Sequence, residues 1–222
     1  MSLSKYSWTL GLFGIVAGAE IIYHSSRKLR HSSDSKNEEE INEIIFTGSS
    51  GNYRISLVRN IFFVCGPQNF AAEVFLNVLL SSRKSVFVAV HVFTSNLFYW
   101  ALIAAKQNGV DVRCVVDAST ENEKHKSLTS LGIPVRIYEE SKMHLNFCVI
   151  DCEKKKSPRS LYYKPSVSIP PNGIVITGSL NWTREALMSN EENFIVSSNL
   201  KLCEESAKKF VTIWEKSKSI LF

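Results

Sequence analysis

The stretch Met143-His144-Leu145-Asn146-Phe147-Cys148-Val149-Ile150-Asp151 is an apolar run with polar residues inserted at period two. Successive side chains of a strand point to opposite faces, so the pattern predicts a buried strand that presents His144 and Asn146 on one side. A second segment, Thr177-Gly178-Ser179-Leu180-Asn181-Trp182-Thr183, predicts a turn after another strand. Its hydroxyl and amide groups are suited to holding an oxyanion or a phosphate.

The chain around these two segments alternates between short apolar runs and longer amphipathic ones. We expect the folded domain to begin around residues 41–54, and Ser95 to cap a helix that Asn108-Gly109 ends. This β-α-β-α succession is typical of an α/β sheet covered by helices. Expected strands cover residues 61–64, 86–93, 110–116 and 133–138, and expected helices cover 69–80, 95–107, 121–130, 182–188 and 200–216.

Length and composition place the chain among globular proteins. With 222 residues, 45% hydrophobic and 21% charged, it can bury one core and is most simply one domain with an N-terminal appendage. The formal net charge of +5 and a pI near 8.9 favour anionic partners such as nucleic acid or acidic lipid. Charge alone does not choose between them, because many enzymes of neutral substrates are equally basic.

The N-terminal region predicts a membrane segment. Tyr6 to Tyr23 is almost entirely apolar and is followed by a basic cluster. As a helix it would span about 27 Å, enough for a thin bilayer. Ala17-Gly18-Ala19 also resembles a signal-peptidase site, so a cleaved signal is the alternative to an anchor. We expect an anchor with its basic flank over residues 1–30, a solvated linker over 31–40, and a catalytic domain over 41–222.

Taken together, the motif residues resemble the phospholipase D superfamily. Its signature is His-x-Lys with an Asp five residues after the Lys, then Gly-Ser-x-Asn and a Glu. The sequence Thr-Gly-Ser-Leu-Asn-Trp-Thr of the second segment resembles the mitochondrial branch, which is the Zucchini or mitochondrial cardiolipin hydrolase group. The residues of this chain that fall on the signature are His144, Asp151, Gly178, Ser179, Asn181 and Glu192.

The resemblance implies a phospholipase D-type α/β fold, a mostly β central sheet flanked by helices, and a reaction without cofactors. A His attacks phosphorus to form a phosphohistidine, and a second His protonates the leaving oxygen. Because the chain has one such motif, the second His implies a homodimer with the active site at its interface. In the catalytic set, His144 would be nucleophile or acid/base, Glu192 would fix its tautomer, and Asp151 would support the motif. Ser179 and Asn181 would bind the phosphate.

One position departs from the signature, because Asn146 stands where the family has its phosphate-binding Lys. An amide keeps hydrogen-bond donors for the phosphate but removes a positive charge, typically worth roughly 10²- to 10³-fold in rate. Three explanations remain open. The enzyme recruits another cation, such as Arg184 or a nearby lysine; the protein is a binder without catalysis; or the substitution inactivates it.

Residues 152–172 form an insertion where the family usually has a short turn. It carries Lys154, Lys155, Lys156 and Arg159 with two tyrosines. One interpretation is a basic flap that contacts an RNA backbone or anionic lipid headgroups. The other is a solvated loop.

The five cysteines predict neither disulfides nor a metal site. They are widely spread, odd in number, and mostly within apolar runs, which is typical of buried thiols in a reducing compartment. Cys148 and Cys152 are spaced as half a metal site, but no second pair completes it. We therefore expect no bound metal.

The mitochondrial branch implies two substrate classes, namely single-stranded RNA cut during the biogenesis of piwi-interacting RNAs, and cardiolipin hydrolysed to phosphatidate. The small size of the chain and its single motif favour the nuclease. The resemblance also implies that the protein lies at the mitochondrial outer membrane. Tyr6 to Tyr23 would anchor it there, with the domain facing the cytosol. A catalytically weak RNA- or phospholipid-binding scaffold is the alternative.

Overall fold

The computed structural model describes residues 41–47, 53–56, 61–64, 70–152 and 167–220. The predicted anchor over residues 1–30, the linker over 31–40 and residues 153–166 of the insertion lie outside these ranges. No helix within the described ranges is long and apolar enough to cross a bilayer.

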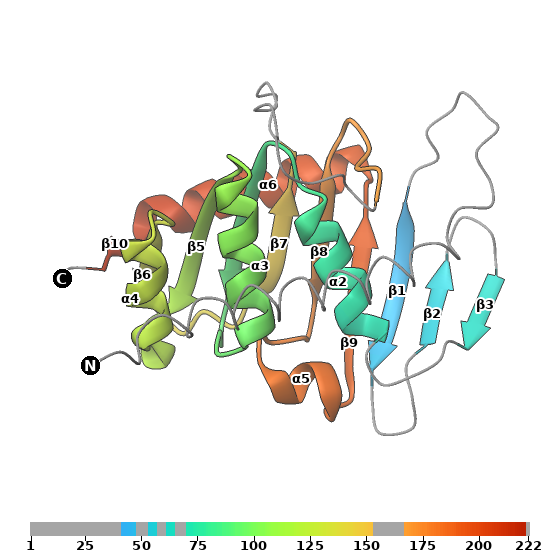
Figure 1. Ribbon diagram of the computed structural model, residues 1–222, viewed down its shortest axis with the longest axis horizontal. Coiled ribbons are helices and arrows are strands. Elements are labelled where there is room, and N and C mark those ends of the chain that lie inside the picture. The colour runs from blue at the N-terminus through green and yellow to red at the C-terminus, as the bar shows by residue number, and fades with distance from the viewer. Residues whose placement is uncertain (1–40, 48–52, 57–60, 65–69, 153–166, 221–222) are drawn as a thin grey trace, which may run out of the picture. The chain divides into compact units, whose positions relative to one another are not determined.

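The strands of the described chain form one mixed sheet (Figure 1). They are β1 (Asn42–Thr47), β2 (Tyr53–Ser56), β3 (Ile61–Val64), β4 (Ser85–Val90), β5 (Asp111–Asp117), β6 (Val135–Tyr138), β7 (Asn146–Ile150), β8 (Ile174–Gly178), β9 (Glu192–Ser197) and β10 (Lys218–Ser219). Their order is β10-β6-β5-β4-β7-β8-β9-β1-β2-β3. The pairs β4–β5 and β5–β6 are parallel, and the other neighbours are antiparallel. The predicted α/β class is confirmed.

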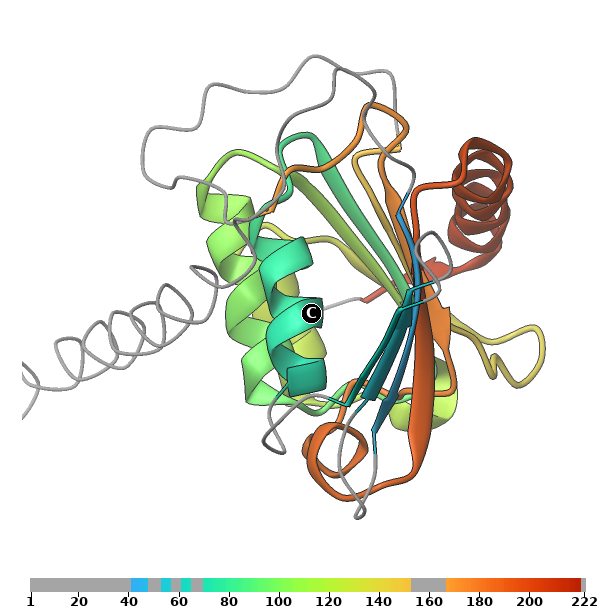
Figure 2. The same ribbon diagram turned by 90° about the vertical axis from the view of Figure 1, so that its right-hand side faces the viewer.

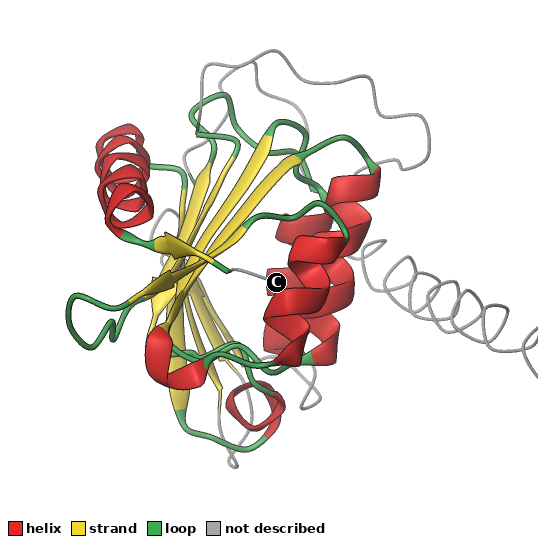
Figure 3. Cartoon of the chain, turned by 90° about the vertical axis from the view of Figure 1, so that its left-hand side faces the viewer, coloured by secondary structure: helices red, strands yellow, loops and turns green. Residues whose placement is uncertain are grey.

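Helices cover both faces of this sheet. The elements are α2 (Phe70–Leu80), α3 (Asn96–Gln107), η2 (Ala118–Thr120), α4 (Glu123–Ser130), α5 (Arg184–Met188) and α6 (Leu200–Lys216). Figure 2 shows α2 and α3 side by side on one face and α6 on the opposite face, and Figure 3 shows the same layers from the other end. The helix α4 packs beside α3 and β6.

The central strand β4 shows why the sheet needs cover on both sides. Val86, Val88 and Val90 lie in the core beneath α2 and α3, whereas Phe87 and Ala89 lie in the core beneath α6. The Phe87 ring stacks on Phe210 of α6 with centroids 4.9 Å apart. A strand buried on both faces reads as a continuous apolar run, which is the pattern of β4.

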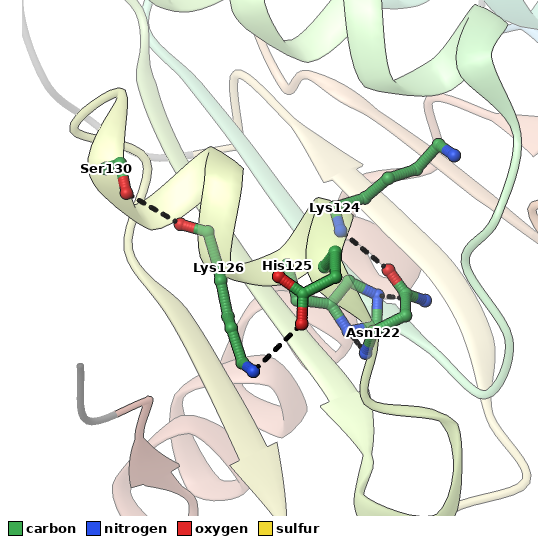
Figure 4. A network of polar contacts seen from close by, with 6 residues as sticks. Asn122, Lys124, His125, Lys126 and Ser130 are labelled. Atoms are coloured by element: carbon green, nitrogen blue, oxygen red, sulfur yellow. Dashed lines mark hydrogen bonds and ion pairs between the residues drawn. The ribbon is translucent and has the colours of Figure 1, made fainter.

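The start of α4 is fixed by a reciprocal cap, shown in Figure 4. The Asn122 side-chain oxygen accepts from the Lys124 N–H at 3.0 Å, while His125 Nδ1 accepts from the Asn122 N–H at 3.2 Å. This is the capping-box arrangement with His in the place of Glu or Gln. Because His125 is fully buried, its pKa is lowered to about 4.

Two predicted strands are shorter than the sequence pattern indicated. The strand expected over residues 143–151 begins at Asn146, because the Met143 N–H is held by the Asp117 carboxylate at 2.6 Å instead of a neighbouring strand. The strand expected over residues 86–93 ends at Val90. Beyond it, Phe93 bridges to Trp182. Both differences lie at the sheet end where the motif residues gather.

Candidate active site

Four neighbouring strands have their ends at the same end of the sheet, where the motif residues lie. In the registers, Val90 pairs with Asn146, Phe147 with Thr177, and Gly178 with Phe194. The end of β4, the start of β7, the end of β8 and the start of β9 therefore lie side by side at one end of the sheet. We call this end, with the loops that follow these strands, the site edge. The predicted residues found there are His144, Asn146, Ser179, Asn181 and Glu192.

His144 is exposed and lies two residues before β7. Its backbone is anchored by its neighbour Met143, whose side chain is buried and whose N–H donates to Asp117. The His144 ring lies against the ring of His91, with centroids 4.9 Å apart and planes inclined by 50°. An anchored, exposed imidazole has the access that a nucleophile needs.

Asn146 is 9% exposed and its amide binds protein groups at both ends. Its Oδ1 accepts from the His91 N–H at 3.1 Å, and its Nδ2 donates to the Ser179 carbonyl at 2.9 Å. The side chain thus joins the end of β4 to the Gly-Ser-x-Asn turn. Contact of Asn146 with a phosphate stays a prediction.

The Gly-Ser-x-Asn turn is docked on the loop that follows β4. Asn181 Oδ1 accepts from the Val92 N–H at 3.3 Å, and the Trp182 N–H donates to the Val92 carbonyl at 2.9 Å. Trp182 is buried and stacks on Phe98 with centroids 4.4 Å apart. This aromatic anchor fixes the turn beside His91.

Ser179 and Glu192 form a polar pair across the ends of β8 and β9. The Ser179 hydroxyl donates to the Glu192 carboxylate, and Ser179 Oγ accepts from the Asn193 N–H at 3.1 Å. The other Glu192 oxygen accepts from Asn190 Nδ2 at 3.2 Å. A Cβ at Gly178 would lie 2.1 Å from the Asn193 carbonyl, so only glycine permits this approach. Within the described chain, Glu192 binds Ser179 and Asn190 and makes no hydrogen bond to His144.

Asp151 lies at the opposite end of β7 from His144. Its carboxylate accepts from the N–H groups of Arg83, Lys84 and Ser85 at 2.7–3.1 Å. The residue takes a φ of 56°, which is unusual for a residue other than glycine. Asp151 ties the α2–β4 turn to the end of β7, and its supporting role in the motif stays a prediction.

Two further residues at this edge were not predicted from the sequence. His91 follows β4 and Asp117 ends β5; Asp117 is 3% exposed. Burial acts to raise the Asp117 pKa, but hydrogen bonds from Ser119 and Met143 and the nearness of His91 hold that pKa below its usual value. For His91 the available signal was a single polar residue in the apolar run of residues 86–93. For Asp117 there was no such signal, because β5 also contains Asp111 and Arg113.

The predicted basic contacts are only partly described. Lys154, Lys155, Lys156 and Arg159 lie outside the described residues. Arg184 is exposed at the first residue of α5, directly after Thr183 caps that helix. Among the described residues, no group of three His, Cys, Asp or Glu side chains is arranged to hold a metal ion.

A helix-covered mixed sheet with an exposed histidine before β7, a Gly-Ser-x-Asn turn and a carboxylate bonded to that turn is typical of a phospholipase D-type domain. The chain belongs to this superfamily, because the family described as "Cardiolipin synthase, PLD-like domain" matches residues 75–214, more than half of its length.

Curated relatives of the chain are named mitochondrial cardiolipin hydrolase. The Drosophila melanogaster protein is 32% identical over 134 residues, which cover 59% of this chain and 53% of the relative. The Homo sapiens protein is 28% identical over 144 residues, covering 63% and 49%. The chain thus spans about half the length of the curated relatives it matches.

Solved structures agree on the fold. A phospholipase D family member, Nuc from Salmonella typhimurium, superimposes with a TM-score of 0.60 at 22% identity, covering 83% of this chain and 100% of that one. NucT from Helicobacter pylori gives 0.55 at 18% identity, covering 69% and 92%.

Proposed function

We propose that this protein is a phosphodiesterase of the phospholipase D type in which His144 attacks phosphorus. The observation that carries the proposal is the placement of an exposed His144 at the sheet edge beside the docked turn of Ser179 and Asn181. The turn supplies hydroxyl and amide groups, which stabilise the charge that develops on the phosphate oxygens.

The reaction needs two imidazoles, one on each side of the phosphorus. His144 forms the N–P bond as the P–O bond to the leaving group breaks, and the partner's His144 gives its proton to the leaving oxygen. The partner's imidazole then takes a proton from water, whose oxygen displaces His144 from phosphorus. The active form is therefore a twofold-symmetric dimer with the site at its interface.

Cardiolipin is the substrate that the names of the relatives favour. Residues 6–23 would anchor the chain at the mitochondrial outer membrane, with the catalytic domain in the cytosol, within reach of a lipid headgroup. Single-stranded RNA is the second candidate, favoured by the positive net charge and by the lysines of the insertion. Both substrates present the same diester to His144.

The test is hydrolysis by the purified full-length chain in EDTA, with cardiolipin vesicles and with labelled single-stranded RNA in separate reactions. We expect one of them to be cleaved, and His144→Ala to abolish cleavage. Equal rates for His144→Ala and the natural protein would contradict the proposal. Size-exclusion chromatography with light scattering gives the oligomeric state, and a monomer that retains full activity would contradict the shared site.

A phosphate-binding protein without catalysis is the alternative function, and the bonded state of Asn146 favours it. Its amide joins two backbone segments, where the superfamily signature has a cation for the phosphate. Asn146→Lys separates the two functions. If only this variant hydrolyses substrate, the natural chain is a binder; if the natural chain already cleaves, it is an enzyme.

A further inference from the structure

His91 and His144 of the same chain form an imidazole pair. Their ring centroids are 4.9 Å apart, which is contact distance. His91 follows the last residue of β4, whereas His144 precedes β7, and these two strands are paired antiparallel. The pairing of the strands therefore places the two rings together, independently of any second subunit.

The backbone of His91 is held on both sides by polar side chains of the site. Its N–H donates to Asn146 Oδ1 at 3.1 Å, and its carbonyl accepts from Thr120 Oγ1 at 2.6 Å. The next N–H, that of Val92, donates to Asn181 Oδ1 at 3.3 Å. Asn146 and Asn181, which stand at the two positions that the signature assigns to the phosphate, thus fix the backbone at His91 and Val92.

The His91 ring itself is not held by a hydrogen bond at its inner nitrogen. Nδ1 is buried and has no hydrogen-bond partner within the described chain. The charged or titratable groups that act on the ring are Asp117, His144 and Lys142. Burial lowers the His91 pKa; Asp117 acts to raise it, and His144 and Lys142 lower it further. The ring is therefore neutral near pH 7, beside the place where an anion would bind.

Building on the proposed function, we infer that His91 takes up a proton when a phosphodiester binds beside His144. The imidazolium then supplies a positive charge that Asn146 does not. A nearby anion favours the charged form of a histidine, so bound substrate would reverse the effect of burial. His91, which follows the adjacent strand β4, thus supplies the positive charge that the signature lysine would carry. It does so only in the substrate complex.

His91→Phe is the informative variant, because phenylalanine preserves the ring contact with His144 and removes the titrating nitrogens. The full-length chain is titrated by NMR of its ¹⁵N-labelled imidazoles with and without dimethyl phosphate, a stable diester whose charge does not change in this pH range. We expect the diester to raise the His91 pKa by about one unit. The buried His125 serves as the control ring, with an unchanged pKa.

Hydrolysis of bis(p-nitrophenyl) phosphate provides the second measurement. We expect kcat/KM of His91→Phe to be about 10- to 100-fold lower at pH 6, with one ionisation missing from its pH profile. A His91 pKa unmoved by diester, together with a wild-type pH profile for His91→Phe, overturns the inference. If no variant hydrolyses any diester but dimethyl phosphate still raises the His91 pKa, the proposed function fails and the charge-supplying role of His91 stands.

Discussion

Asn146 carries two structural hydrogen bonds at the position where a substrate contact was predicted. Asn146→Leu keeps the size of the side chain but leaves the His91 N–H and the Ser179 carbonyl without partners. We expect the free energy of unfolding to fall by about 1–3 kcal/mol, because two part-buried backbone groups lose their hydrogen bonds to the amide. Urea denaturation measures the change.

The control for this substitution is Asn96→Leu on the exposed surface of α3, which should change stability by less than about 0.5 kcal/mol. Equal stability of Asn146→Leu and the natural chain would show that the amide contributes nothing to the fold. It would then remain available for phosphate.

Sequence reasoning identified His144, Ser179, Asn181 and Glu192, because each belongs to a local motif with fixed spacing. It missed His91, whose position beside His144 depends on the pairing of β4 with β7 across more than 50 residues of chain. Nothing in the spacing of residues 86–93 distinguishes a site histidine from a core one. Contacts of this range are set by the sheet order, which the linear pattern does not specify.

At the scale of elements, one carboxylate ties β7 to the turn between α2 and β4. Asp151→Gly keeps the positive φ without strain and removes only the acceptor of three N–H groups, so it isolates the carboxylate. We expect a loss of at least about 3 kcal/mol in the free energy of unfolding. Asp151→Asn, which retains one acceptor oxygen and also tolerates this φ, should lose less.

Glu123→Gln is the matched control for Asp151, since the Glu123–Lys126 pair is exposed on α4. Such a pair contributes less than about 1 kcal/mol. Thermal or urea unfolding gives the order of the variants. An Asp151→Gly protein as stable as Glu123→Gln would show that the Asp151 carboxylate does not stabilise the contact between β7 and the α2–β4 turn.

The elements themselves were predicted where periodicity is strong, as in α3, β5 and α6, and missed where it is short or irregular. The sequence analysis named Glu192 but predicted no strand around it, because the length of β9 is set by its pairing with β1 and β8. The strand β10 has two residues and depends wholly on β6. Such strands form through partners that lie far away in the chain.

At the scale of the whole molecule, stability should fall at acid pH through His125. Its pKa is about 4 in the folded chain and about 6.5 when unfolded, so the unfolded state binds the extra proton between these values. Stability is then fully present above about pH 6.5 and decreases as pH falls towards 4. We expect a loss of about 2 kcal/mol from this group between pH 7.5 and pH 5.

His125→Gln removes the titration while preserving the cap, since Gln is a normal residue at this position of a capping box. Its free energy of unfolding should therefore fall by about 2 kcal/mol less than that of the natural chain over the same pH interval. Parallel slopes for the two proteins would mean that folding does not lower the pKa of His125.

The place of β1 between β9 and β2 has a consequence for synthesis on the ribosome. Asn42 pairs with Ser197 of β9, a separation of 155 residues. At roughly 5–20 residues per second, β1 leaves the ribosome about 8–30 s before its partner exists. Until then the β1–β2 hairpin presents an unpaired edge, a known template for association between chains. The nascent protein therefore needs protection on that edge until its last quarter has been translated.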